Sequence, residues 1–152
     1  LIMTYNKLWK DYIIKDQAHL WNGRELAPMI EYIHPNMYTY KCKVLRVIDG
    51  DTLDLSIDLG FNITNKIRVR LIDVDTPEVR GKDKEFGLMV TDKVREWVNN
   101  ISGQIYVSTR KTGKYGRWLA RIFYKDLEMS GKDIYLHEYL IDNKYLKGSN
   151  DN

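Results

Sequence analysis

The sequence predicts an α+β domain that is mainly β, in which five strands close into a small barrel and helices pack against it. Three observations support this fold class. Residues 52–59 alternate strictly between apolar and polar side chains, which is the period of a half-buried strand. Residues 86–101 repeat apolar side chains every three or four positions, as an amphipathic helix does. The length of 152 residues, with 43% hydrophobic and 30% charged residues, suits one domain with a modest core.

The N-terminal residues are rich in aromatic and charged side chains but show no clean period. Apolar residues at helical spacing over 8–13 indicate one short amphipathic helix. Pro28 and a His-Pro-Asn turn interrupt the stretch before the first strand. We expect residues 1–37 to form an N-terminal extension that packs on the domain or binds a protein partner. The domain is then expected over 38–148, with a short tail at 149–152.

Strand patterns dominate the next part of the chain. Residues 38–48 alternate between apolar and polar side chains, and the strictly alternating segment 52–59 follows. A turn over 60–65 leads to a third strand over 67–71. Lys66, Arg68 and Arg70 occupy the face of this strand opposite to its apolar residues.

A helix, two strands and a last helix complete the order of elements. After the helix at 86–101, strands are expected near 104–110 and 118–124. The last helix is expected over 136–142, with Asn143 suited to the left-handed position that follows it. Three strands, a helix, two strands and a helix fit the oligonucleotide/oligosaccharide-binding (OB) fold, a five-stranded barrel.

Charge and cysteine content narrow the function classes only slightly. The 24 basic and 21 acidic residues give a formal net charge of +3, which permits nucleic-acid binding without predicting it. Cys42 is the only cysteine, which excludes an intramolecular disulfide and a cysteine-based zinc site, and its strand position favours a buried thiol. No run reaches the length of a membrane span, and the first ten residues lack the apolar centre of a signal peptide. We expect no membrane contact and a cytoplasmic location, unless a leader has been removed.

The residues that could carry chemistry are concentrated in three motifs. The first is the run Asp-Gly-Asp-Thr at 49–52, the second runs from Arg70 to Glu78, and the third is Lys-Tyr-Gly-Arg at 114–117. Carboxylates gathered beside arginines supply what a divalent cation and a phosphodiester need in one place. The combination points to a metal-dependent nuclease.

The carboxylates of the first two motifs suit a hard cation, which would neutralise charge on the phosphoryl oxygens during hydrolysis. Ca²⁺ binds oxygen ligands, and Asp51 and Asp75 are the natural carboxylate candidates. Asp51 alone would be interpreted as a turn residue, since Asp-Gly pairs commonly make turns. The motifs also contain a second carboxylate and two arginines, and this combination favours a metal site. Oxygen ligands alone would suit magnesium or manganese equally well.

Arg70 and Arg117 are the candidate phosphate ligands. A guanidinium can donate two parallel hydrogen bonds to a phosphate, which a lysine cannot reproduce. Arg68 lies on the same strand as Arg70 and is interpreted as a solvated surface residue. None of the three histidines falls within a motif, so structural or surface roles are favoured for them.

In their order and spacing, the three motifs resemble the staphylococcal nuclease (thermonuclease) family, over roughly residues 40–146. The resemblance implies an OB fold, a Ca²⁺ cofactor and nuclease activity. It places the metal at Asp51, Asp75 and the backbone carbonyl of Thr76.

The same resemblance assigns the remaining site residues. Arg70 and Arg117 match the two catalytic arginines of the family. Glu78 matches the glutamate that activates or orients the attacking water. Lys114 and Tyr115 would lie at the mouth of the site and contact a flanking phosphate or stack on a base.

Four features depart from the family pattern. Asp73 stands where related sequences have a small or apolar residue, so it either faces solvent in a bulge or adds negative charge near the metal. The loop over 79–84 is shortened, which could change substrate access. We expect no counterpart of the third helix of the best-known member, and an aromatic side chain over the nucleotide base is not evident.

Two functions remain open at this point. The first is a Ca²⁺-dependent endonuclease that cleaves DNA and RNA with low sequence specificity and leaves 3′-phosphate ends, as the resemblance implies. The alternative is a catalytically inactive OB-fold module that binds nucleic acid. The presence of every charged residue that the family uses favours the enzyme. We expect DNA or RNA as the substrate, and a monomer.

Overall fold

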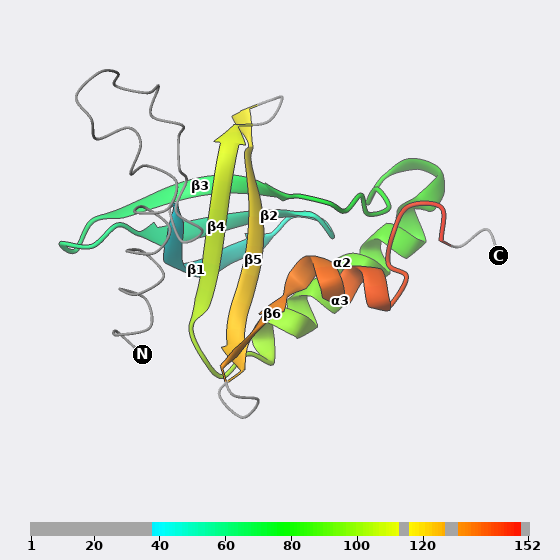
Figure 1. Ribbon diagram of the computed structural model, residues 1–152. Coiled ribbons are helices and arrows are strands. Elements are labelled where there is room, and N and C mark those ends of the chain that lie inside the picture. The colour runs from blue at the N-terminus through cyan, green and yellow to red at the C-terminus, as the bar shows by residue number, and fades with distance from the viewer. Residues whose placement is uncertain (1–37, 113–115, 127–130, 150–152) are drawn as a thin grey trace, which may run out of the picture. The chain divides into compact units, whose positions relative to one another are not determined.

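The computed structural model describes residues 38–112, 116–126 and 131–149 (Figure 1). The predicted N-terminal extension, residues 1–37, lies outside the described residues. The short helix expected within it and its proposed role in binding a protein partner therefore stay predictions. Among the described residues, no helix is both long enough and apolar enough to cross a membrane.

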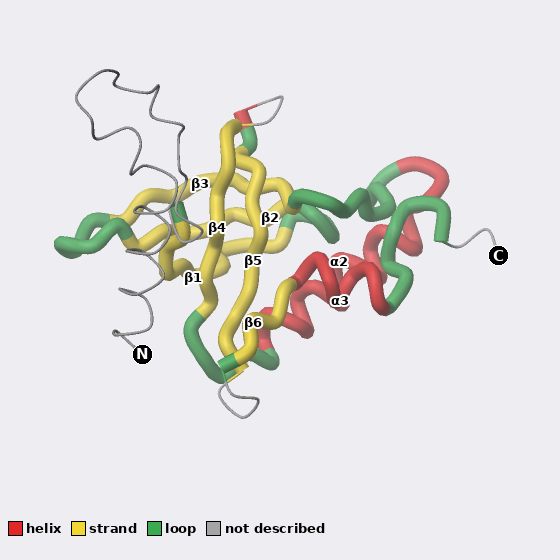
Figure 2. Tube along the Cα trace, viewed as in Figure 1, coloured by secondary structure: helices red, strands yellow, loops and turns green. Residues whose placement is uncertain are grey.

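Five strands form the barrel, as the sequence predicts (Figures 1 and 2). They are β1 (Thr39–Val47), β2 (Thr52–Asp58), β3 (Thr64–Leu71), β4 (Ile105–Thr112) and β5 (Trp118–Asp126). Antiparallel pairing gives the order β3-β2-β1-β4-β5. Parallel pairing of β3 with β5, from Val69 opposite Trp118 to Leu71 opposite Ala120, closes the sheet on itself. The α+β, mainly β fold class and the OB-type barrel are thereby confirmed.

Alternation along the strands fills the inside of the barrel with apolar side chains. Leu53, Leu55 and Ile57 of β2 point inward and are at most 3% exposed, as their period of two predicts. Cys42 of β1 belongs to the same core, and its burial raises the pKa of the thiol to about 12. The predicted role of Cys42 as a buried, unreactive side chain is confirmed.

Two α-helices pack against the barrel, α2 (Lys84–Asn99) against β1 and α3 (Leu136–Asp142) against β5 and a short strand, β6 (Lys132–Tyr135). A 3₁₀ turn, η1 (Gly81–Asp83), precedes α2. Val90 and Val94 of α2 are fully buried, and Trp97 meets the ring of Tyr124 edge-on at 5.4 Å between centroids. The predicted amphipathic helix is therefore the element that covers this side of the core.

Two local features differ from the prediction. A sixth strand, β6 (Lys132–Tyr135), pairs with β5; its four residues are too few to show a period in the sequence. After α3, the left-handed residue is Lys144, with φ of 57°, and not Asn143. Asn143 instead donates its side-chain amide to the Tyr139 carbonyl at 2.8 Å. The N–H groups of Lys144 and Tyr145 then cap the carbonyls of Ile141 and Leu140 in a Schellman motif.

Candidate active site

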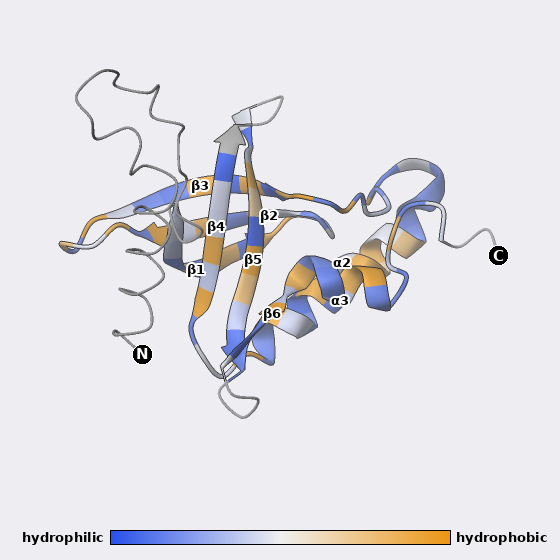
Figure 3. Ribbon diagram, viewed as in Figure 1, coloured by the Kyte–Doolittle hydropathy of each residue, from blue (hydrophilic) through white to orange (hydrophobic). Residues whose placement is uncertain are grey.

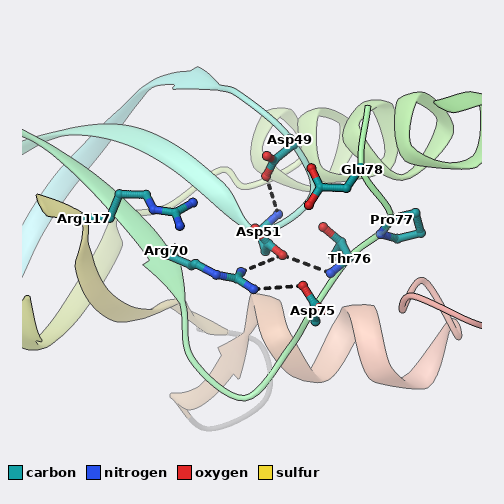
Figure 4. Close-up of a pocket in the computed structure, with 8 residues that line it drawn as sticks. All are labelled: Asp49, Asp51, Arg70, Asp75, Thr76, Pro77, Glu78 and Arg117. Carbon is teal, nitrogen blue, oxygen red and sulfur yellow. Dashed lines mark hydrogen bonds and ion pairs between the residues drawn. The ribbon is translucent and has the colours of Figure 1, made fainter. Parts of the chain in front are cut away.

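One polar pocket, of about 120 Å³, collects residues from all three sequence motifs (Figure 4). Its lining residues come from the β1–β2 turn, the end of β3, the loop before η1 and the segment just before β5. They are Asp49, Asp51, Arg70, Asp75, Thr76, Pro77, Glu78 and Arg117. Six of the eight predicted site residues are thus brought together. The other two, Lys114 and Tyr115, lie outside the described residues.

The β1–β2 turn lies close against the rest of the site, because Gly50 has no side chain to keep it away. A Cβ atom at this position would lie 2.7 Å from Thr76 Oγ1 and 2.7 Å from Val90 Cγ1. The backbone of the turn therefore approaches both the site loop and α2 more closely than any other residue would allow. The Leu71 N–H donates to the Asp51 carbonyl at 2.8 Å and ties the same turn to the end of β3.

Asp51 is the buried carboxylate of the site, with the residue only 6% exposed. Its Oδ2 accepts a hydrogen bond from the Thr76 N–H at 3.0 Å and lies 2.7 Å from Arg70 Nη1. Its Oδ1 accepts a hydrogen bond from the Thr52 hydroxyl at 3.1 Å. A buried carboxylate is stable only with such partners, so the orientation of Asp51 is fixed by the fold.

Arg70 bridges the two predicted metal carboxylates. Besides its contact with Asp51, it donates from Nη2 to Asp75 Oδ1 at 2.9 Å (Figure 4). Partial burial lowers the pKa of Arg70, but the two neighbouring carboxylates outweigh that effect and raise it. Nη1 is buried and, among the described residues, has no hydrogen bond of good geometry beyond its ion pair with Asp51. Arg70 thus holds donor capacity inside the pocket.

Asp49 also lines the pocket, a position that the sequence interpretation missed. Its Oδ1 accepts a hydrogen bond from the Asp51 N–H at 3.1 Å. Burial raises the pKa of Asp49, and the nearby negative charge of Asp51 raises it further. The signal was present in the first motif, where two aspartates flank one glycine, but the spacing alone did not show that both face the same pocket.

Glu78 lines the pocket from the loop before η1, and its side chain is exposed. Its backbone is fixed by α2, because a Cβ atom at Gly87 would overlap the Glu78 carbonyl group. Gly87 is therefore required for the helix to pass so close to the loop. A carboxylate that is exposed at a firmly held backbone position can reach a water inside the pocket.

Arg117 precedes β5 and extends toward the pocket from the same side as Arg70 (Figure 4). Two guanidinium groups therefore face the group of carboxylates. Asp73, the unusual residue of the second motif, does not line this pocket. It adopts a left-handed conformation, with φ of 70°, and pairs with Arg121. Its carboxylate is thus neutralised outside the site, and the side chain faces solvent.

The residues of the pocket fit a hard cation by the chemistry of their donors. Asp51, Asp75 and Glu78 offer only oxygen atoms, which Ca²⁺ and Mg²⁺ prefer. Within the described part of the chain, no three acidic, histidine or cysteine side chains form a ready-made metal cluster. Arg70 instead supplies the positive charge between Asp51 and Asp75, so a bound cation would take over its carboxylates and release the guanidinium.

Comparisons with known proteins identify a matching family model and two similar proteins. Residues 68–143 match a family model described as "Staphylococcal nuclease homologue". The chain is similar to the protein ParB of Escherichia coli, with 33% identity over 81 residues, covering 53% of this chain and 40% of that protein. It is also similar to a micrococcal nuclease of Shigella flexneri, with 28% identity over 97 residues, covering 64% of this chain and 49% of that protein. The chain spans about half the length of these relatives or less.

Proposed function

The chain belongs to the staphylococcal nuclease family, and from that premise we propose that it is a Ca²⁺-dependent endonuclease that hydrolyses DNA and RNA with low sequence specificity. One observation carries the proposal: two arginines and an all-oxygen set of donors line a single pocket. An OB-fold module that only bound nucleic acid would need the arginines, but would have no use for acidic side chains beside a phosphate.

In this proposal, Asp51, Asp75 and the backbone carbonyl of Thr76 would hold the cation. Bound Ca²⁺ would neutralise the phosphoryl oxygens and help to position the attacking water. Asp51 is suited to this role because its hydrogen bonds to Thr76 and Thr52 hold the carboxylate in one orientation. Asp75, whose side chain is 60% exposed, can adjust to the ion.

Arg70 and Arg117 bind the scissile phosphate. Once Arg70 is released from the two carboxylates, its guanidinium can donate two parallel hydrogen bonds to the phosphoryl oxygens. Charge on these oxygens grows as the water attacks, so both arginines bind the transition state more tightly than the substrate. Lys114 and Tyr115 are proposed to contact the flanking nucleotide.

Glu78 acts on the attacking water as a general base or as the group that orients it. The water oxygen forms a bond to phosphorus as the P–O5′ bond in line with it breaks, and the departing O5′ takes up a proton from bulk water. The products would be one strand with a 3′-phosphate and one with a free 5′-hydroxyl.

Cleavage of a single-stranded DNA labelled at its 5′ end tests the proposal, with Ca²⁺, with Mg²⁺ and with chelator. We expect cutting with Ca²⁺ and no cutting with chelator. Treatment with a 3′-phosphatase should remove the terminal phosphate of the labelled products and so lower their negative charge. Asp75→Asn should raise the Ca²⁺ concentration needed for half-maximal cutting, whereas Asp142→Asn, at the end of α3, should not. Tight DNA binding with no cutting under any metal would contradict the proposal and leave a binding module.

A further inference from the structure

The tip of the β2–β3 hairpin carries an aromatic side chain that folding does not explain. Phe61 is 97% exposed, and both Phe61 and Asn62 have positive φ, of 52° and 60°. The Ile63 N–H closes the turn on the Gly60 carbonyl at 2.8 Å. Positive φ at both central residues favours Asn-Gly and strains a bulky residue. Phe61 is thus strained without being buried, which points to a role in binding.

A hollow of about 490 Å³ lies beside this aromatic ring. Its lining includes two lysines of β1, Lys41 and Lys43, and the amides of Asn62 and Gln104. The volume falls within the range of small-molecule clefts, about 300–1,000 Å³. An aromatic ring for stacking and lysines for a phosphate are the two groups with which proteins bind single-stranded nucleic acid.

A line of basic residues connects this hollow with the candidate active site. Lys66, Arg68 and Arg70 alternate along the outer face of β3. The register places Lys43, Ser56 and Lys66 in one row across the sheet, and Arg46, Asp54 and Arg68 in the next row. The outer face of β1–β3 carries Lys41, Lys43, Arg46, Lys66 and Arg68 against two aspartates: Asp54, which pairs with Arg68, and Asp58, which lines the hollow.

We propose that the outer face of β1–β3 is a track for single-stranded nucleic acid, on which Phe61 stacks a base in the hollow and the basic rows guide the strand to Arg70. The continuation of the track into the pocket rests on the proposed nuclease function. From Arg70 to Thr64 at the end of β3 is about 20 Å at 3.3 Å per residue. Only a substrate of several nucleotides can reach both sites.

The position of the basic residues favours nucleic acid over a lipid surface. Figure 3 shows hydrophobic colouring at the tip of the hairpin, with Leu59, Phe61 and Ile63 exposed there. A membrane would contact this tip alone. The basic rows instead extend along the sheet, away from the tip and toward the pocket. A strand that follows them gains from every row.

Binding of a fluorescent 12-nucleotide single-stranded DNA, measured in chelator so that no cutting occurs, tests the track. Phe61→Ala should weaken binding by about tenfold, and Phe61→Trp should restore it, because a base stacks on any aromatic ring. Lys66→Ala should weaken binding and make the slope of log affinity against log salt shallower by about 0.7. The matched controls Ile141→Ala on α3 and Lys132→Ala on β6 should bind as the wild type does.

A second measurement separates the track from the pocket. With Ca²⁺, Phe61→Ala should raise the KM for the 12-nucleotide strand. This increase should be about tenfold larger than the increase in the KM for a dinucleotide, which is too short to reach Phe61. Unchanged binding by Phe61→Ala, or full rescue by Phe61→Leu, would overturn the proposal. The proposal would also be overturned if Phe61→Ala lost binding to anionic lipid vesicles but kept its binding to DNA. If no wild-type cutting is found but Phe61→Ala still weakens binding, the nuclease proposal fails while the track stands.

Discussion

The two ends of the β2–β3 pair differ in how firmly their groups are held. At the pocket end, Gly50 packs against Thr76 and Val90, and the carboxylate of Asp51 is buried with partners at both oxygens. At the hairpin end, Phe61 is almost fully exposed in a left-handed conformation. A Cβ atom at the neighbouring Gly60 would meet nothing within 4 Å.

This difference separates two kinds of functional surface. The pocket end is preorganised by the core, so substitutions there should change both chemistry and stability. The hairpin end is attached to the core only through its strands, so substitutions there should change binding with little effect on folding. The predictions that follow test this contrast, from the largest effect to the smallest.

Among the substitutions that compare the two ends, the largest effect is expected from Arg70→Lys in the pocket. A lysine keeps the positive charge but cannot contact Asp51 and Asp75, or two phosphoryl oxygens, with separate nitrogens. We expect kcat for DNA cleavage to fall by about 10²–10³-fold. The matched change Arg95→Lys, on the exposed face of α2, should leave kcat as it is. Equal kcat values for the two variants would show that Arg70 serves only as a structural ion pair.

A smaller effect is expected from adding one methyl group to a glycine at each end. Gly50→Ala forces Thr76 or Val90 to move, so we expect the free energy of unfolding to fall by about 1–3 kcal/mol. The methyl group added by Gly60→Ala meets no atoms, but the residue keeps a φ of +80°. The free energy of unfolding should therefore fall by about 1 kcal/mol.

Urea unfolding in chelator measures both glycine variants. Cleavage activity should drop in Gly50→Ala, because the turn that carries Asp51 shifts, and should persist in Gly60→Ala. A larger loss of stability at Gly60 than at Gly50 would reverse the contrast between the two ends.

The smallest effect is expected from the ion pair between the two ends. Arg68 Nε and Nη2 donate to the two oxygens of Asp54 at 2.7 and 2.9 Å. Both side chains are solvent-accessible, 50% and 26% exposed, so the coupling should be only about 0.2–1 kcal/mol despite the good geometry. A double-mutant cycle with Arg68→Ala and Asp54→Ala checks this value. A coupling of several kcal/mol, unaffected by salt, would mean that this pair is organised like the pocket.

The sequence predicts much of the fold because most elements have a strong period. The alternation of β2 and the three-to-four repeat of α2 both correspond to buried faces in the structure. The left-handed Lys144 and the short strand β6 were missed, since each depends on contacts with other segments and not on its own residues.

The site was predictable in membership but not in arrangement. Three motifs identified six of the lining residues, because charged residues of those types seldom gather without a function. The bridge from Arg70 to Asp51 and Asp75 could not be foreseen, since it depends on how β3 and the loop after it meet. The exposure and the positive φ of Phe61 could not be predicted either, because a predicted turn specifies neither its dihedral angles nor the direction of its side chains.

The most direct test of the account is cleavage of a labelled single-stranded DNA with Ca²⁺ by the wild type and by Glu78→Gln, with DNA binding measured in parallel. The account predicts that Glu78→Gln binds DNA as tightly as the wild type but cuts it about 10²–10⁴-fold more slowly, because the amide cannot accept a proton from the water. Equal cutting rates for the two proteins would contradict the assignment of this pocket as the nuclease site.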